Sequence, residues 1–157
     1  MPCRARALSV LAALLLVPAV AAAGCGGNSQ ERGDYVKAVN DAQNRLAKRF
    51  STLQSQIKAT STPQEDQRTL TGYETAVREA VTSLNGVNPP NGFDGLHKRF
   101  VGEIADYGTE VRRARSSLDS TKPERVIAAQ RRLVTAVGQI SARINATIAA
   151  INRKLKE

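Results

Sequence analysis

Few residues in this sequence could do acid–base or metal chemistry. His97 is the single histidine of the chain and Asp94 precedes it by three residues, so one interpretation of this pair is a metal ligand or a general base. A di-iron helical bundle needs two histidines and about four inward carboxylates. The candidate acids lie mostly outside the repeating apolar positions; they are Glu74, Glu79, Glu103, Asp106 and Glu110. We therefore expect His97 to be half-buried and satisfied by a cap or a backbone carbonyl. We predict no catalytic residues, no metal site and no cofactor.

The other reactive side chains are the thiols of Cys3 and Cys25, and the sequence around them is typical of export. Residues 1–24 begin with the basic Arg4 and Arg6 and continue with about 14 largely apolar residues, which is the length of a signal-peptide core and too short for a comfortable membrane span. Three alanines follow at positions 21–23. Because Cys3 lies inside this predicted signal peptide, we expect no disulfide framework.

The tetrapeptide "AAGC", Ala22 to Cys25, resembles the lipobox of bacterial lipoproteins, with Ala22 where that family usually has leucine. The resemblance implies that Cys25 carries a diacylglycerol and becomes the N-terminus after a dedicated peptidase cuts before it. Residues 25–33 are then a lipidated cysteine and a flexible polar linker, and the protein is lipid-anchored on the exported side of the cell membrane. The alternative is ordinary signal-peptidase cleavage after Ala21 or Ala23. The chain also resembles, loosely, the small helical lipoproteins of GC-rich bacteria, a likeness that implies no activity.

The elements that must position any site are helices, because apolar residues repeat at helical spacing through residues 34–157. The stripes and their punctuation predict helices over about 34–59, 62–86, 91–118 and 121–156. Capping boxes at Thr62–Glu65 and Thr121–Glu124 open the second and the fourth. Since each stripe must be buried and short connections favour antiparallel neighbours, we predict an all-α, up-down-up-down four-helix bundle. A long two- or three-helix coiled coil that dimerises is the alternative.

Two details of these stripes carry further expectations. The fourth helix has the widest stripe, which includes Ile127, Val134, Ile148 and Leu155 and suggests contact with two partner helices. Gly102 and Gly108 interrupt the third helix at about 1 kcal/mol each relative to alanine. Either that helix is locally soft, or a neighbouring helix packs closely against it there.

The positive charge is concentrated in the last third of the chain. The net charge is +9, and residues 111–157 hold 11 lysines and arginines against three acids. The predicted topology places one basic group at the end of the bundle near the lipid anchor: Lys98, Arg99, Arg153, Lys154 and Lys156. We expect these residues to face the bilayer. A second group falls at the far end: Arg112, Arg113, Arg115, Lys122 and Arg125.

Three interpretations of the far group compete. The first is a solvated helix face, because the helix dipole favours lysine and arginine near a helix C-terminus. The second is a docking patch for an acidic envelope polymer or protein, and the third is a nucleic-acid site. The chain has no tryptophan and only six phenylalanines and tyrosines, which argues against nucleic acid.

The leading hypothesis is a membrane-tethered, non-catalytic interaction module of the cell envelope. The alternative is a small-ligand-binding bundle that uses the polar stripe positions Gln43, Gln130 and Thr147.

Overall fold

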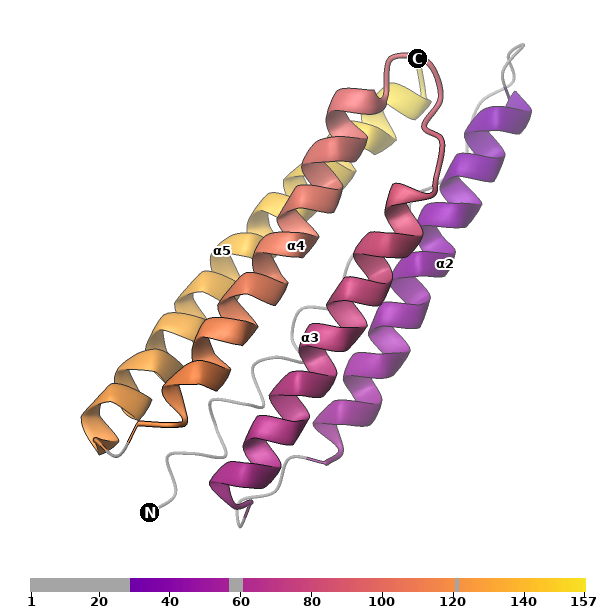
Figure 1. Ribbon diagram of the computed structural model, residues 1–157. Coiled ribbons are helices and arrows are strands. Elements are labelled where there is room, and N and C mark those ends of the chain that lie inside the picture. The colour runs from indigo at the N-terminus through magenta and orange to yellow at the C-terminus, as the bar shows by residue number, and fades with distance from the viewer. Residues whose placement is uncertain (1–28, 57–60, 121) are drawn as a thin grey trace.

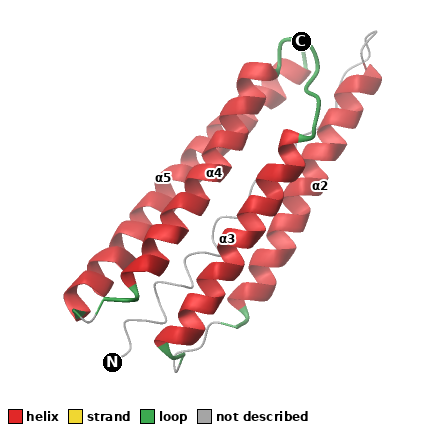
Figure 2. Cartoon of the chain, viewed as in Figure 1, coloured by secondary structure: helices red, strands yellow, loops and turns green. Residues whose placement is uncertain are grey.

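The computed structural model describes residues 29–56, 61–120 and 122–157, which form four helices (Figure 1). Those described residues contain no strand (Figure 2), which confirms the all-α four-helix prediction. The helices are α2 (Ser29–Gln54), α3 (Pro63–Asn85), α4 (Asp94–Ser117) and α5 (Pro123–Leu155).

The contacts between α2 and α3 follow opposite residue orders. Arg45 of α2 donates to the hydroxyl of Ser83 in α3 at 2.7 Å, and one helical turn later Arg49 meets Glu79 at 3.2 Å. Between α4 and α5, Glu103 accepts from Thr147 at 3.1 Å. The first helix also meets the last, because Arg32 donates to the backbone carbonyl of Leu155 at 3.1 Å.

The start of α3 confirms the first capping box. The Thr62 hydroxyl accepts from the backbone N–H of Glu65 at 3.2 Å, and the Glu65 carboxylate accepts from the backbone N–H of Thr62 at 2.7 Å. Pro63 occupies the first turn, where its missing N–H leaves no hydrogen bond unmade.

The second predicted capping box, Thr121–Glu124, is wrong because the N-cap of α5 is one residue later than expected. The N-cap of α5 is Lys122, with no side-chain capping bond, while Thr121 lies outside the described residues. The reason is the position of the proline. Pro63 follows Thr62 directly, whereas Lys122 stands between Thr121 and Pro123. A proline in the first helical position makes the residue just before it the cap.

Helix α2 differs most from its prediction. It starts at Ser29 instead of Asp34, so the last five residues of the expected flexible linker, 29–33, are helical. It ends at Gln54, and the last three residues of its predicted range, 57–59, lie outside the described residues. The extra turn has a tertiary cause, since Arg32 within it bonds to the end of α5. The Gln30 amide also donates to Asp34 at 3.1 Å.

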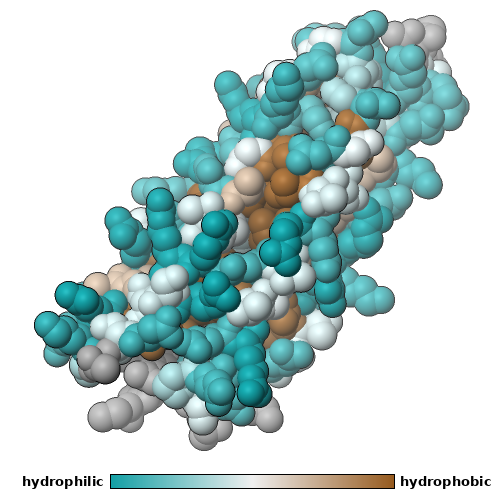
Figure 3. All heavy atoms as spheres, viewed as in Figure 1, coloured by the Kyte–Doolittle hydropathy of each residue, from teal (hydrophilic) through white to brown (hydrophobic). Residues whose placement is uncertain are grey.

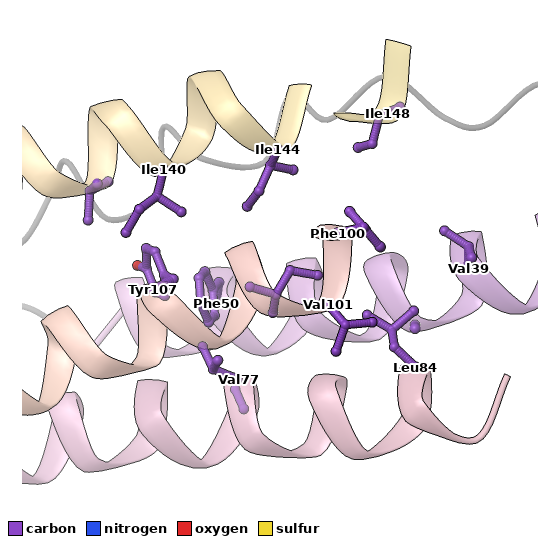
Figure 4. Close-up of a cluster of buried hydrophobic side chains, with 14 of the residues drawn as sticks. Val39, Phe50, Val77, Leu84, Phe100, Val101, Tyr107, Ile140, Ile144 and Ile148 are labelled. Carbon is purple, nitrogen blue, oxygen red and sulfur yellow. The ribbon is translucent and has the colours of Figure 1, made fainter. Parts of the chain in front are cut away.

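The core is aromatic at its centre and aliphatic along α5. Phe50 of α2 packs edge-on against Tyr73 and at a tilt against Tyr107, with ring centroids 4.7 and 5.3 Å apart. Ile144 and Ile148 of α5 project toward the interior that also holds these rings (Figure 4). One expectation for α5 is wrong: Ile127 is 45% exposed and does not belong to the buried stripe.

The two glycines of α4 have different surroundings. A Cβ on Gly108 would lie 3.0 Å from Cγ1 of Val77, so α3 packs closely against this position. A Cβ on Gly102 would meet nothing within 4 Å. Close packing therefore explains Gly108 and leaves Gly102 without a structural reason.

Burial of the tyrosines predicts unfolding at alkaline pH. Burial raises the pKa of Tyr35 and of Tyr73 to about 12, and it raises the pKa of Tyr107 well above the ordinary 10. Between these values the unfolded chain loses phenolic protons that the folded chain keeps, so the free energy of unfolding should decrease as pH rises above about 10. Urea titrations at increasing pH measure this. Tyrosinate absorbance is easily followed because the chain has no tryptophan.

The control for this experiment is Tyr107→Phe. The Tyr107 hydroxyl is buried and has no hydrogen-bond partner among the described residues, so its removal should keep stability at neutral pH. The same change should make the alkaline loss shallower. Equal slopes in both proteins would contradict the assignment.

Candidate functional site

His97 links three helices, because it lies on α4 and contacts α2 and α3. It is buried, and its Nε2 lies 3.0 Å from the backbone carbonyl of Leu84. Because a carbonyl only accepts, Nε2 donates to Leu84, while Nδ1 is in hydrogen-bond contact with the Tyr35 hydroxyl at 3.3 Å. Both ring nitrogens are therefore occupied by α3 and α2. Contact with a backbone carbonyl is what the sequence predicted, although the side chain is more buried than expected.

Glu103 corrects the expectation that the acids of α4 avoid the core. It is 8% exposed, its Oε1 accepts from the Thr147 hydroxyl, and its Oε2 has no partner among the described residues. Helix α4 buries a wide part of its surface because it packs against both α3 and α5. Gly108 lies close to Val77 of α3, and Asp106 accepts from Arg143 of α5. Within the described ranges, no group of three or more histidine, cysteine or acidic residues is arranged to hold a metal ion.

This buried pair predicts an asymmetric mutational result. Thr147→Val removes the hydroxyl that donates to Glu103 and should lower the free energy of unfolding by about 1–3 kcal/mol, since a buried carboxyl group loses its hydrogen bond. Adding Glu103→Leu should recover most of that loss, because both partners are then apolar. Chemical denaturation of the single and double variants tests this. A double variant less stable than Thr147→Val would contradict it.

The three polar stripe positions have different environments. Thr147 is buried and bonds to Glu103, whereas Gln43 and Gln130 are half-buried. The amide nitrogen of Gln43 is itself buried without a partner among the described residues. Thr147 thus contributes to a hydrogen bond between α4 and α5.

The structure separates the predicted distal basic group into three parts. Arg115 turns toward α3, where its Nε lies 2.9 Å from Glu74 and its guanidinium donates to the Thr71 hydroxyl at 3.2 Å. Lys122 is the exposed cap residue of α5. Arg112, Arg113 and Arg125 come together along a groove between α4 and α5.

This groove, which we call the arginine groove, has a volume of about 780 Å³. Its floor contains Ala114 and Leu133, and its walls carry arginines from both helices. The full lining comprises Glu110, Arg112, Arg113, Ala114, Ser116, Ser117, Arg125, Ala128, Ala129, Arg132 and Leu133. It lies at the end of the bundle where α4 joins α5, the orange end of these helices in Figure 1.

Sequence reasoning missed Arg132. It follows Arg125 by seven residues, which is two helical turns, so the two side chains share one face of α5. That spacing was a usable signal. The neighbouring Arg131 is exposed and does not line the arginine groove.

The second basic group does gather at the opposite end. Lys154 of α5 lies 5.5 Å from the ring centroid of Phe93, which is the N-cap of α4, and the start of α2 meets Leu155. Lys98 and Arg99 are exposed on the first turns of α4, and Arg153 and Lys156 are exposed at the end of α5. In the space-filling view, polar residues cover much of the visible face around a central apolar strip (Figure 3).

Cys25 and the predicted signal peptide lie outside the described residues. In the part of the chain that the structure does describe, none of the helices combines the length and the apolar character that crossing a membrane requires. Searches of protein-family models, curated proteins and solved structures found no match to this chain.

Proposed function

We propose that this protein is a lipid-anchored component of the cell envelope, tethered through Cys25, and that its helical bundle is a non-catalytic interaction module. The observation that carries the proposal is the "AAGC" tetrapeptide at the end of a basic and then apolar leader. Two or three acyl chains on one residue give stable anchoring, at about 0.8 kcal/mol per buried methylene.

The charge distribution supports a tether at this end of the bundle. The described chain begins at Ser29, beside the end of α5 that carries Arg153, Lys154 and Lys156. Each basic residue near an anionic lipid surface contributes about 1 kcal/mol of attraction. An acyl group at Cys25 would therefore hold this basic end close to the headgroups.

The side chains with catalytic potential support a non-enzymatic module. Both nitrogens of His97 are occupied by protein partners, and one oxygen of Glu103 accepts from Thr147. The surface offers in their place an arginine-lined groove, which suits recognition of an acidic partner.

The mass of the intact protein extracted from membranes tests the tether. We expect a chain that begins at Cys25 and carries the added mass of a diacylglycerol and its acyl groups. A chain that begins at Ala22 or Gly24 with a free thiol would overturn the proposal, because it matches cleavage by ordinary signal peptidase.

A further inference from the structure

The arginine groove is positively charged with little internal compensation. Glu110 is the single acid in its lining, and its carboxylate is already ion-paired with Arg113. Arg112, Arg125 and Arg132 form no ion pair with any described residue. Three guanidinium groups thus remain available around one hollow. Guanidinium is the cation best shaped to bind a carboxylate through two hydrogen bonds.

The floor of the groove is apolar and built from small side chains. Ala114, Ala128 and Ala129 lie in the lining together with Leu133. Alanines let another backbone approach closely, and covering them gains free energy only if the occupant has an apolar face of its own. A purely polyanionic chain would satisfy the arginines and leave this floor without a partner.

The spacing of the arginines matches a helix. Arg125 and Arg132 are seven residues apart, about 10.5 Å along α5. Carboxylates seven residues apart on a second helix have the same separation. Arg112 contributes from α4, on the other wall of the groove.

From these observations we propose that the arginine groove binds an acidic amphipathic helix of a partner protein. The partner helix places carboxylates against Arg112, Arg125 and Arg132 and rests small apolar side chains on the alanine floor. This inference rests on the proposed role as an interaction module and names the chemistry of its partner.

The test uses the full mature chain, purified from membranes in detergent, and a synthetic fluorescent peptide of about 18 residues, long enough to form a helix. The peptide has glutamates at heptad spacing along one face, and alanine and leucine along another. We expect Arg132→Glu to weaken its binding about tenfold or more, as loss of a charge-assisted pair implies. The matched control is Arg131→Glu, the same charge change one residue away and outside the groove, which should change binding less than about twofold. Equal losses in both variants would overturn the proposal, because a general positive field would then explain binding.

A second variant separates a helix from a polyanion. Ala128 is exposed in the folded chain, so Ala128→Phe should keep the fold and fill the groove. It should weaken the peptide about tenfold and leave binding of inorganic polyphosphate unchanged. If polyphosphate binds tightly and the peptide does not, the proposal of a helical partner is overturned and the occupant of the arginine groove is a polyanion.

The two proposals fail in different ways. A chain that carries acyl groups but binds no peptide refutes the groove alone. A chain that binds the peptide but has no acyl group refutes the tether alone.

Discussion

Cys25→Ser should move the cleaved protein, which has lost its leader, from the membrane fraction to the soluble fraction almost completely. Without the thiol no thioether to diacylglycerol can form, so the acyl chains that anchor the protein are absent. The remaining attraction comes from the exposed bases Lys98, Arg99, Arg153 and Lys156. Such surface charges are screened beyond about 8 Å at physiological salt. Fractionation of cells followed by immunoblotting measures the change.

Cys3→Ser is the matched control for this experiment. It removes the other cysteine of the chain, which lies in the predicted signal peptide, and it should leave both the membrane fraction and the mature mass unchanged. A Cys25→Ser chain that still carries the predicted signal peptide is recognised by its larger mass. The distribution between the membrane and soluble fractions is therefore measured on the cleaved chain. A cleaved Cys25→Ser protein that stays in membranes would contradict anchoring through this residue.

Ile148→Ala should lower the free energy of unfolding by about 2–5 kcal/mol. Ile148 is a fully buried residue of the α5 stripe, 0% exposed (Figure 4), so truncation removes apolar contacts and leaves a cavity among the surrounding side chains. Urea denaturation followed by circular dichroism gives the difference, and a reduced midpoint with an unchanged slope identifies a change in stability.

Ile127→Ala provides the same chemical change on the same helix at a residue that is 45% exposed. It should cost no more than about 0.5 kcal/mol, as surface substitutions usually do. Similar losses for the two variants would mean that α5 buries a different face.

Local signals predicted most of the fold. The Thr62–Glu65 box depends on four consecutive residues, and the heptad positions of α5 depend only on helical period, so both can be recognised without knowledge of the tertiary structure. Features that depend on distant residues were missed. The first turn of α2 is held by Leu155, more than a hundred positions away, and Glu103 is buried because α4 has neighbours on two sides.

The candidate site was predicted in part for the same reason. Clustered arginines at the end of α4 and the start of α5 are visible in the sequence, but their directions are not. Arg113 and Arg115 are two residues apart on one helix, and one lines the arginine groove while the other pairs with Glu74 of α3. Only the relative rotation of the packed helices decides between these outcomes.

The length of α5 has a consequence for where binding takes place in a chain anchored at Cys25. The helix has 33 residues, about 50 Å at 1.5 Å per residue, with the arginine groove near its first turns and the basic end beside α2 at its last. Residues 26–28 separate Cys25 from α2 and can reach at most about 14 Å with the bond to Ser29 included. The linker would therefore keep the basic end of the bundle close to the lipid, and a bundle that stands upright on it would extend about 50 Å outward. It would present its binding groove several screening lengths above the lipid, where headgroup charge does not compete for the arginines.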